Sequence, residues 1–496
     1  MSIQAETTTS SHLREPGKDE RFFIIRNALN YYNNVGMTAY ITLPEISEEQ
    51  FLPTVHRAIA STVQQHPMLQ VNLAHELDDK VSFSPLEIIR LLDVLTCRTW
   101  AFNDFGNDDV GLDAELEREH NRAFVSGLPQ WRLLLMRDTE VNLVGLIRFT
   151  FSFFYHHVLG DGLSGLAFLK CFVNSLQLPP TSDPISPTLP VSSQALPPNV
   201  EELTSMVEKG ADEMVSDQEK KDPPISKVIP ASSESESPPK VWIGSIPVNT
   251  LPVSSRFSSF TVPPRETQIL RQICSAQSVS MTPLLQTIVA KSVFLAIPSD
   301  FDQLRGLCSL NLRPHLDNSV VQTAMGNYVG GFATVYNRKS LVGKETNLQG
   351  SRDEGFWKEV RRTKESTLAA IDTEKKKIEM TSRPAPSGVK TQGLDMVTWM
   401  QGLIGQPRVA SFDINNLGTV AFNQGVLGTV ELGKVVFSAS QSAIGSALKI
   451  NIVTSPKGYM VIGLAWQQEV INDGLAPKIV ETVKNLIDDL VATRND

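Results

Sequence analysis

The chain has 496 residues, 41% of them hydrophobic and 20% charged, with a formal net charge of −9 and a pI near 5.5. This length suits two large domains or about three average ones, and the composition is that of a globular protein with sizeable cores. The acidic balance argues against nucleic acid as a partner, because phosphate binding needs a concentrated basic face.

The cysteines and the N-terminus indicate the cellular compartment in which the protein is expected. The four cysteines are far apart and form no CxxC pair, so the sequence predicts neither a disulfide framework nor a structural zinc site. The polar N-terminus lacks the apolar segment of a signal peptide, and no run of 18 apolar residues occurs. We therefore expect a cytoplasmic protein without a transmembrane segment.

The first half of the chain alternates predicted helices and strands. Residues 1–20 are polar and are expected to be disordered. Ser47 and Gln50 form a capping box for an apolar helix that stops before Pro67. Further along we expect short strands at 71–73 and 80–83, a charged helix at 113–124, and strands at 131–136 and 143–155 that lie side by side. The alternation predicts an α/β layer structure with mixed strand directions.

A change of composition separates the two halves. Residues 179–250 are rich in proline and serine, which indicates a crossover linker, partly disordered, with one short helix near 201–208. The second half repeats the architecture of the first, with helices expected at 265–276, 281–296, 356–371 and 476–491 and strands at 258–262, 304–311, 413–417, 435–437, 448–454 and 459–466, and another opening near 326–331. The last helix carries an apolar stripe, which fits burial against a sheet or contact with a lipid surface.

Residues 149–172, FTFSFFYHHVLGDGLSGLAFLKCF, connect a phenylalanine-rich strand to an apolar helix through a tight loop. Gly160, Gly162 and Gly165 match the GxGxxG pattern of dinucleotide-binding proteins, but no second strand ending in an acid follows. The run from Gly162 to Gly165 resembles a nucleophile elbow, but its second glycine comes one position early for GxSxG. We therefore interpret Ser164 as a first-turn helix residue.

Two adjacent histidines end the strand. Because neighbouring strand residues point to opposite faces, one of His156 and His157 is expected to face a cleft and the other to pack. A neutral imidazole near pH 7 is the usual general base. Asp161 can fold back to hold the loop, and the flanking glycines permit the bend. Two other interpretations of His156 and His157 are possible: they are ordinary residues at the end of a strand, or they bind a metal together with Asp161. The other six histidines form no ligand motif, so we expect no metal.

At this point the motifs carry a family resemblance. The run from His156 to Gly162, HHVLGDG, resembles the HHxxxDG signature of the chloramphenicol acetyltransferase-like superfamily of CoA-dependent acyltransferases and condensation domains. Within it, the chain is most similar to fungal alcohol acetyltransferases. The order of supporting motifs agrees over residues 20–490: Arg26-Asn27 to Tyr31-Tyr32, His66-Pro67-x-Leu69, Asn311-Leu312-Arg313-Pro314, Met325-Gly326-Asn327, Phe356-Trp357 and Asn416-Leu417-Gly418.

The resemblance implies two α/β subdomains, residues 21–178 and 251–496, with an active-site tunnel between them. His157 would be the general base and would act without an acyl-enzyme. Asp161 would be structural and pair with Arg313 as a bidentate salt bridge, and Gly162 would support the loop. Candidate contacts to the substrate or the oxyanion are His156, Asn415, Asn416, Ser440 and Gln441. Asp413-Ile414-Asn415-Asn416 stands where the plant-type DFGWG loop would be.

The expected reaction is acyl transfer from acetyl-CoA or another acyl-CoA to a hydroxyl of a small alcohol or secondary metabolite, by a monomer and without a metal. Lys375-Lys376-Lys377 is a local basic patch for the cofactor phosphates, although charge runs are usually solvated. Two alternatives stay open: a condensation-type N-acyltransferase with a carrier-bound donor, and a catalytically degenerate binding protein on the same fold.

Overall fold

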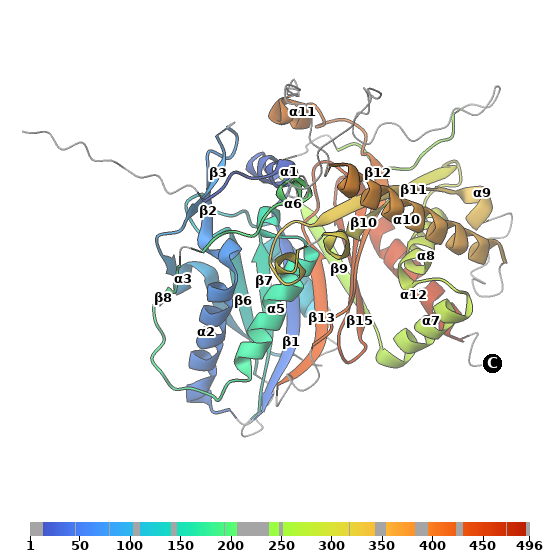
Figure 1. The fold of residues 1–496 in the computed structure, drawn as a ribbon. Coiled ribbons are helices and arrows are strands. Elements are labelled where there is room, and N and C mark those ends of the chain that lie inside the picture. The colour runs from blue at the N-terminus through green and yellow to red at the C-terminus, as the bar shows by residue number, and fades with distance from the viewer. Residues whose placement is uncertain are drawn as a thin grey trace, which may run out of the picture.

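Two β-sheets lie side by side at the centre of the molecule, with helices packed on their outer faces (Figure 1). The computed structural model describes residues 13–44, 46–78, 80–102, 110–139, 146–192, 194–205, 238–247, 251–316, 318–342, 354–381, 395–422, 430–472 and 474–492. The predicted α/β layer structure with mixed sheets is confirmed.

The first sheet has the strand order β13-β1-β7-β6-β5. Its strands are β1 (Val35–Pro44), β5 (Leu95–Trp100), β6 (Trp131–Asp138), β7 (Leu146–Tyr155) and β13 (Glu431–Ala439). β7 runs antiparallel to both β1 and β6, so the predicted pairing of β6 and β7 is confirmed. Helices α2 (Glu48–Gln65) and α5 (Gly162–Leu176) cover one face of this sheet (Figure 1), and the predicted capping box of Ser47 and Gln50 opens α2.

β7 is buried on both faces, which explains its nearly continuous aromatic sequence. On one face, Phe151 stacks on Phe172 and Phe153 stacks on Phe168 of α5, each with 3.8 Å between ring centroids. On the other face, Phe154 belongs to a core that both halves of the chain share. The strand is thus held from both sides, and it places the two histidines that follow it at a fixed position.

The second sheet has the order β11-β10-β12-β14-β15-β9. Its strands are β9 (Ser255–Val262), β10 (Gln303–Asn311), β11 (Val329–Asn337), β12 (Ala410–Thr419), β14 (Ser446–Thr454) and β15 (Met460–Gln467), and the helices packed on it are α7 (Pro264–Ala276), α8 (Met281–Ala296), α10 (Glu354–Thr381) and α12 (Leu475–Ala492). The apolar stripe of α12 is buried in this core, as its sheet-packing interpretation predicted, so the stripe is not available to a lipid surface.

The strand β13 joins the two halves. It lies within the predicted C-terminal subdomain, yet it pairs antiparallel with β1 and completes the first sheet. Its other neighbours are β14 and β15 of the second sheet. The core between the sheets combines residues of both halves: Tyr40, Phe154, Phe257, Val436 and Val461 among others. The sequence did not indicate that β13, a strand of the second half, joins the first sheet. We call this arrangement the exchange of β13.

The remaining α-helices and strands lie outside the two large sheets and the helices listed with them. They are α1 (Lys18–Ala28), β2 (Val71–Ala74), β3 (Ser82–Pro85), β4 (Ile89–Arg90), α3 (Leu91–Val94), α4 (Val110–His120), β8 (Thr188–Leu189), α6 (Val200–Ser205), α9 (Arg338–Leu341) and α11 (Met396–Gln401). The expected disorder up to residue 20 is wrong at its end, because α1 begins at Lys18; residues 1–12 lie outside the described residues, as do residues 206–208 of the predicted linker helix.

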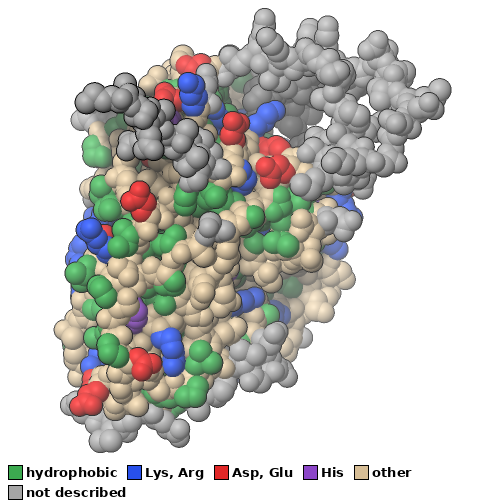
Figure 2. Space-filling view, turned by 60° about the vertical axis from the view of Figure 1, so that its left-hand side comes forward, with side chains coloured by type: hydrophobic (Ala, Val, Ile, Leu, Met, Phe, Trp, Pro, Cys, Tyr) green, Lys and Arg blue, Asp and Glu red, His purple; other side chains and the backbone are tan. Residues whose placement is uncertain are grey.

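On the face drawn in Figure 2, basic and acidic side chains are interspersed and do not gather into a patch of one sign. In the described part of the chain, no single helix has the length and apolar character to cross a membrane, whereas α7 and α8, bent by 103°, meet that test as a pair by length and composition only.

Candidate active site

The loop between β7 and α5 contains the HHVLGDG motif. A single 3-10 turn, η2 (His157–Leu159), follows the strand, and Asp161 then caps α5 by accepting hydrogen bonds from the backbone N–H and the hydroxyl of Ser164, both at 3.1 Å. A Cβ at Gly162 would come within 2.8 Å of the side chains of Leu417 and Phe437. A side chain at this position would force Leu417 or Phe437 to shift, so close packing favours glycine here in addition to the bend that the sequence indicated.

The two histidines point to different environments, as predicted. His156 is fully buried, and its Nδ1 accepts a hydrogen bond from the backbone N–H of Val158 at 2.9 Å. Its Nε2 is buried without a partner among the described residues. His156 does not line the pocket described below, so its prediction as a substrate contact is wrong; His157 is the histidine that lines it.

Asn327 fixes the tautomer of His157. The amide nitrogen of Asn327 donates to the backbone carbonyls of His157 and Val158, at 2.9 and 3.0 Å. Its amide oxygen must then face the Nδ1 of His157, 3.1 Å away. Because an amide oxygen only accepts, Nδ1 carries the proton and Nε2 carries the lone pair. The unprotonated ring nitrogen of His157, which lines the pocket, is therefore Nε2.

Aromatic rings hold the imidazole plane. Phe23 of α1 stacks on His157 with 3.9 Å between centroids and 14° between planes, and Tyr32 lies at 5.9 Å. Burial, and after it the nearby guanidinium of Arg26, lower the pKa of His157 to about 3. The imidazole is thus neutral at pH 7, the state that a general base needs.

Asp161 and Arg313 form a buried bidentate pair, as the resemblance implied. The guanidinium donates to both carboxylate oxygens, at 2.7 and 3.1 Å, and also to the backbone carbonyl of Val321 at 2.9 Å. Both side chains are at least nine-tenths buried. Asp161 also accepts from the backbone N–H of Tyr328 at 3.1 Å. This network joins the loop after β7 to the segment between β10 and β11, so it connects the two halves of the chain.

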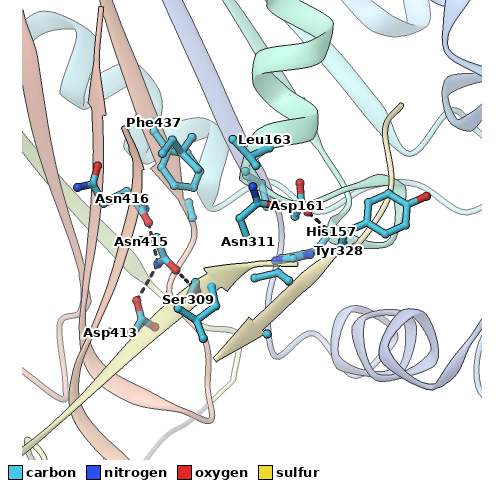
Figure 3. Close-up of a pocket in the computed structure, with 18 of the residues that line it drawn as sticks. His157, Asp161, Leu163, Ser309, Asn311, Tyr328, Asp413, Asn415, Asn416 and Phe437 are labelled. Carbon is cyan, nitrogen blue, oxygen red and sulfur yellow. Dashed lines mark hydrogen bonds between the residues drawn. The ribbon is translucent and has the colours of Figure 1, made fainter. Parts of the chain in front are cut away.

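The pocket beside His157 is a cavity of about 500 Å³ between the two sheets. Figure 3 shows His157 and Asp161 on one side of it and Asp413 and Asn415, from β12, on the other. A second cavity of about 1020 Å³ lies next to α5, and Lys170 of this helix is among the residues that line it. The two cavities share Leu163, Asn311 and Arg313, so they adjoin at the histidine loop.

Of the four polar residues predicted in the second half as contacts, two line the pocket and two do not. Asn415 lines it, but its amide nitrogen donates to Asp413 and Asn451, at 3.0 and 3.1 Å, and its oxygen accepts from Ser309. Asn416 lines it and donates to Thr282 at 3.1 Å. These amide groups are engaged within the protein.

Ser440 and Gln441 have structural roles instead. The hydroxyl of Ser440 accepts from the backbone N–H groups of Asn33 and Asn34, at 3.0 Å each, which fixes β13 against β1. The amide of Gln441 donates to the carbonyls of Ala447 and Ala465. Neither residue lines the pocket, so their prediction as substrate or oxyanion contacts is wrong.

The predicted lysine patch lies on the last turns of α10. Lys375 and Lys376 are exposed, Lys376 pairs with Asp372 at 2.7 Å, and neither lines the two cavities. The side chain of Lys377 lies outside the described residues. A role of these lysines toward cofactor phosphates stays a prediction. Among the residues that the structure describes, no cluster of His, Cys, Asp and Glu is arranged to hold a metal ion.

The structure also places residues in the site that the sequence analysis quoted only as family motifs or not at all. Asn327 orients His157, Asn311 lines both cavities, and Arg26 and Lys449 bring two cations to the pocket. Of these, the motifs around Arg26, Asn311 and Asn327 were visible in the sequence, whereas no signal marked Lys449.

Comparison with known proteins identifies the family. A family model described as alcohol acetyltransferase matches residues 15–487. The chain belongs to the alcohol acetyltransferase family. It is 28% identical over 488 residues to the probable alcohol acetyltransferase crmB of Aspergillus fumigatus, covering 94% of this chain and 97% of that protein. It is 21% identical to the probable alcohol acetyltransferase FCK4 of Fusarium pseudograminearum, covering 93% of this chain and 92% of that one.

Solved structures agree on the fold of this acetyltransferase. The trichothecene 15-O-acetyltransferase TRI3 from Fusarium sporotrichioides matches with a TM-score of 0.65 at 10% identity, covering 96% of this chain and 95% of that one. The first condensation domain of the CDA synthetase matches with a TM-score of 0.59 at 11% identity, covering 97% of each chain. The fold is therefore the two-subdomain architecture of these acyltransferases, as predicted.

Proposed function

We propose that the protein transfers an acetyl group from acetyl-CoA to the hydroxyl of a small alcohol or secondary metabolite, with His157 as the general base. The observation that carries this proposal is the orientation of His157: Asn327 holds Nδ1, and the imidazole lines a pocket between the sheets. A neutral imidazole with a lone pair on Nε2 is suited to take a proton from a bound alcohol.

In the proposed mechanism the reaction has two steps. Nε2 of His157 takes the hydroxyl proton while the alcohol oxygen forms a bond to the thioester carbonyl carbon. The tetrahedral intermediate then collapses, the carbon–sulfur bond breaks, and the departing thiolate takes the proton from Nε2. The products are the ester and free CoA thiol, and no bond to the enzyme forms.

Asn311 is the residue we assign to the oxyanion. It ends β10 and lines both cavities, close to His157 and Asp161 in Figure 3. Its amide oxygen accepts from the backbone N–H of Arg313 at 3.1 Å, and its amide nitrogen has no partner among the described residues. A free donor at the junction of the cavities is suited to the negative charge that develops on the carbonyl oxygen.

The two cavities give the two substrates separate approaches. We assign the alcohol to the pocket of about 500 Å³, a size typical of small-ligand sites, and the acyl-CoA arm to the cavity beside α5. Asp161, Gly162 and Arg313 keep the loop between them in place and do not take part in the chemistry.

The test is thiol release from acetyl-CoA in the presence of a panel of alcohols, with products identified by mass spectrometry. We expect ester formation that depends on both substrates. Acetylation of an amine from an acylated carrier protein, with no turnover of free acetyl-CoA, would overturn the proposal in favour of condensation-type chemistry. Binding of both substrates without turnover would overturn it in favour of a binding protein.

A further inference from the structure

The pocket beside His157 contains a cation that forms no ion pair with the described residues. Arg26, in the last turn of α1, lines this pocket. Its Nε and Nη2 are buried and have no hydrogen-bond partner among the described residues. An arginine cannot lose its charge in a protein, and a buried charge without a partner is unfavourable. The pocket therefore holds an unsatisfied guanidinium.

Aromatic rings position this guanidinium near the base. Its central carbon lies 4.0 Å from the ring centroid of Tyr32 and 5.2 Å from that of Phe23. Phe23 is also the ring that stacks on His157 at 3.9 Å. The cation and the imidazole thus flank the same ring, which places the cation within reach of a small substrate whose hydroxyl lies at Nε2. The CoA phosphates are separated from the thioester by the whole pantetheine arm, so they do not fit this position.

A second cation lies beside the first. The ammonium group of Lys449, on β14, lies 4.6 Å above the ring of Tyr32 and donates to the carbonyl of Ser440 at 3.1 Å. Only 8% of the residue is exposed. Lys449 and Arg26 therefore share Tyr32 as a neighbour, and both line the pocket.

Asp413 is the acidic residue that lines the pocket near these cations, but it does not form an ion pair with either of them. Its carboxylate accepts from the amide of Asn415 at 3.0 Å and from the hydroxyl of Ser446 at 2.9 Å. Among the described residues it forms no ion pair with Arg26 or Lys449. Two cations and one hydrogen-bonded carboxylate leave this end of the pocket with an excess of positive charge.

We infer that Arg26 and Lys449 form a binding subsite for a carboxylate of the substrate. The guanidinium fork matches a planar carboxylate in two parallel hydrogen bonds, and the ammonium group adds a third donor. This inference deepens the proposed function, on which it rests for the reaction. The carboxylate has two sources that suit the chemistry: a hydroxy acid as acceptor, or a dicarboxylic acyl group on the donor.

The experiment compares matched substrates. The first arm measures kcat/KM with acetyl-CoA for mandelate and for its neutral methyl ester. The second arm measures kcat/KM for malonyl-CoA and acetyl-CoA with a neutral alcohol. The wild-type enzyme is expected to prefer the carboxylate form in one arm, and that arm identifies the source.

Variants then test the residues. Arg26→Gln should lower the preference ratio about tenfold to a hundredfold, the range for loss of a charged hydrogen bond, and Arg26→Lys should keep more of the ratio. Arg361→Gln and Lys457→Gln, which remove cations that line neither cavity, should leave it unchanged. If Arg26 acts only by electrostatics on His157, both substrates change by the same factor and the ratio stays constant, which would overturn the subsite.

A second variant and a binding measurement test the carboxylate subsite even if Arg26→Gln does not fold or the proposed acetyl transfer is not observed. If Arg26→Gln does not fold by circular dichroism, Lys449→Gln tests the same ratio. If no alcohol in the panel is acetylated, the proposed function fails, and calorimetric titration decides the subsite by binding alone. Mandelate should then bind more tightly than methyl mandelate, or malonyl-CoA more tightly than acetyl-CoA, with the difference lost in Arg26→Gln. Equal binding within both pairs would overturn the inference.

Discussion

Asn327 turns its amide oxygen to the Nδ1 of His157 at 3.1 Å, because its amide nitrogen is occupied by two backbone carbonyls of the histidine loop. Asn327 comes from the segment before β11, far along the chain from the loop that it orients. The tautomer of the histidine that we propose as the base is thus set by a residue of the other half.

Replacement of Asn327 by Ala should therefore lower kcat more than it changes KM, because the imidazole loses its fixed tautomer. We expect a loss of about fivefold to a hundredfold, the worth of one buried hydrogen bond. Steady-state kinetics of acetyl transfer measure the separate effects on kcat and KM. An increase in KM alone would show that Asn327 contacts the substrate instead.

Removal of the base should have the larger effect. His157→Ala is expected to lower kcat about a hundredfold to ten-thousandfold, the usual range for a positioned general base. His75→Ala is the matched control, since His75 is an exposed histidine that lines neither cavity. Thiol release from acetyl-CoA measures both variants, and a folded His157→Ala protein with full activity would refute the assignment.

Asn311→Ala tests the oxyanion assignment. The expected loss in kcat is about a hundredfold to a thousandfold, as for other single oxyanion donors. Asn416→Ala is a suitable comparison, because its amide nitrogen is engaged by Thr282. Equal effects of the two substitutions would argue that Asn311 acts through packing only.

The buried pair of Asp161 and Arg313 predicts a large loss of stability. Asp161→Ala leaves the guanidinium buried without its carboxylate, which should lower the free energy of unfolding by about 3–5 kcal/mol. The exposed pair of Lys376 and Asp372 provides the control: Asp372→Ala should change stability by about 1 kcal/mol or less. Urea denaturation followed by circular dichroism compares the two, and similar midpoints would contradict the prediction.

Stability should also fall in mild acid. Burial lowers the pKa of His66 to about 4 and those of His120, His156 and His157 to about 3. In the unfolded chain these histidines have a pKa near 6.5. Below that pH they therefore bind more protons in the unfolded chain than in the folded protein. The stabilisation is therefore complete above about pH 6.5 and is lost as the pH falls toward 4.

Four carboxyls among the described residues work in the opposite sense, because burial raises the pKa of Glu76, Asp413 and Asp488 as well as that of Asp19. Burial and neighbouring acids raise the pKa of Asp19 to about 6, so its folded form gains protons first as the pH falls. Five histidines of the described chain have a lowered pKa, the four named above and His56, and they outnumber these carboxyls. Thermal unfolding at about pH 7.5 and pH 5 should give a lower midpoint at the acidic pH, and an equal or higher midpoint would contradict this sign.

The sequence predicted the parts of the site that are local in the chain. The strand of alternating phenylalanines, the helix after it and the different environments of His156 and His157 follow from periodicity and from the alternation of strand faces. The pairing of Asp161 with Arg313 came from the family resemblance, and the structure contains it.

The parts that depend on tertiary placement were not predictable in this way. Ser440 and Gln441 stand next to a strand of the second half, but the exchange of β13 into the first sheet directs their side chains to backbone groups rather than to the pocket. Arg26 was visible as part of a motif, but its role depends on the rings of Phe23 and Tyr32 around it and on Lys449, which β14 places beside Tyr32. A pattern of residue types does not specify which helix end faces which cavity.

The exchange of β13 also orders events during synthesis of the chain. β1 leaves the ribosome early, but its partner β13 follows only after the linker and most of the second half have been made. Until then β1 presents an unpaired strand edge, a template for wrong partners. The nascent protein therefore needs shielding of this edge, and a fragment that ends within the linker should aggregate rather than accumulate as an independent domain.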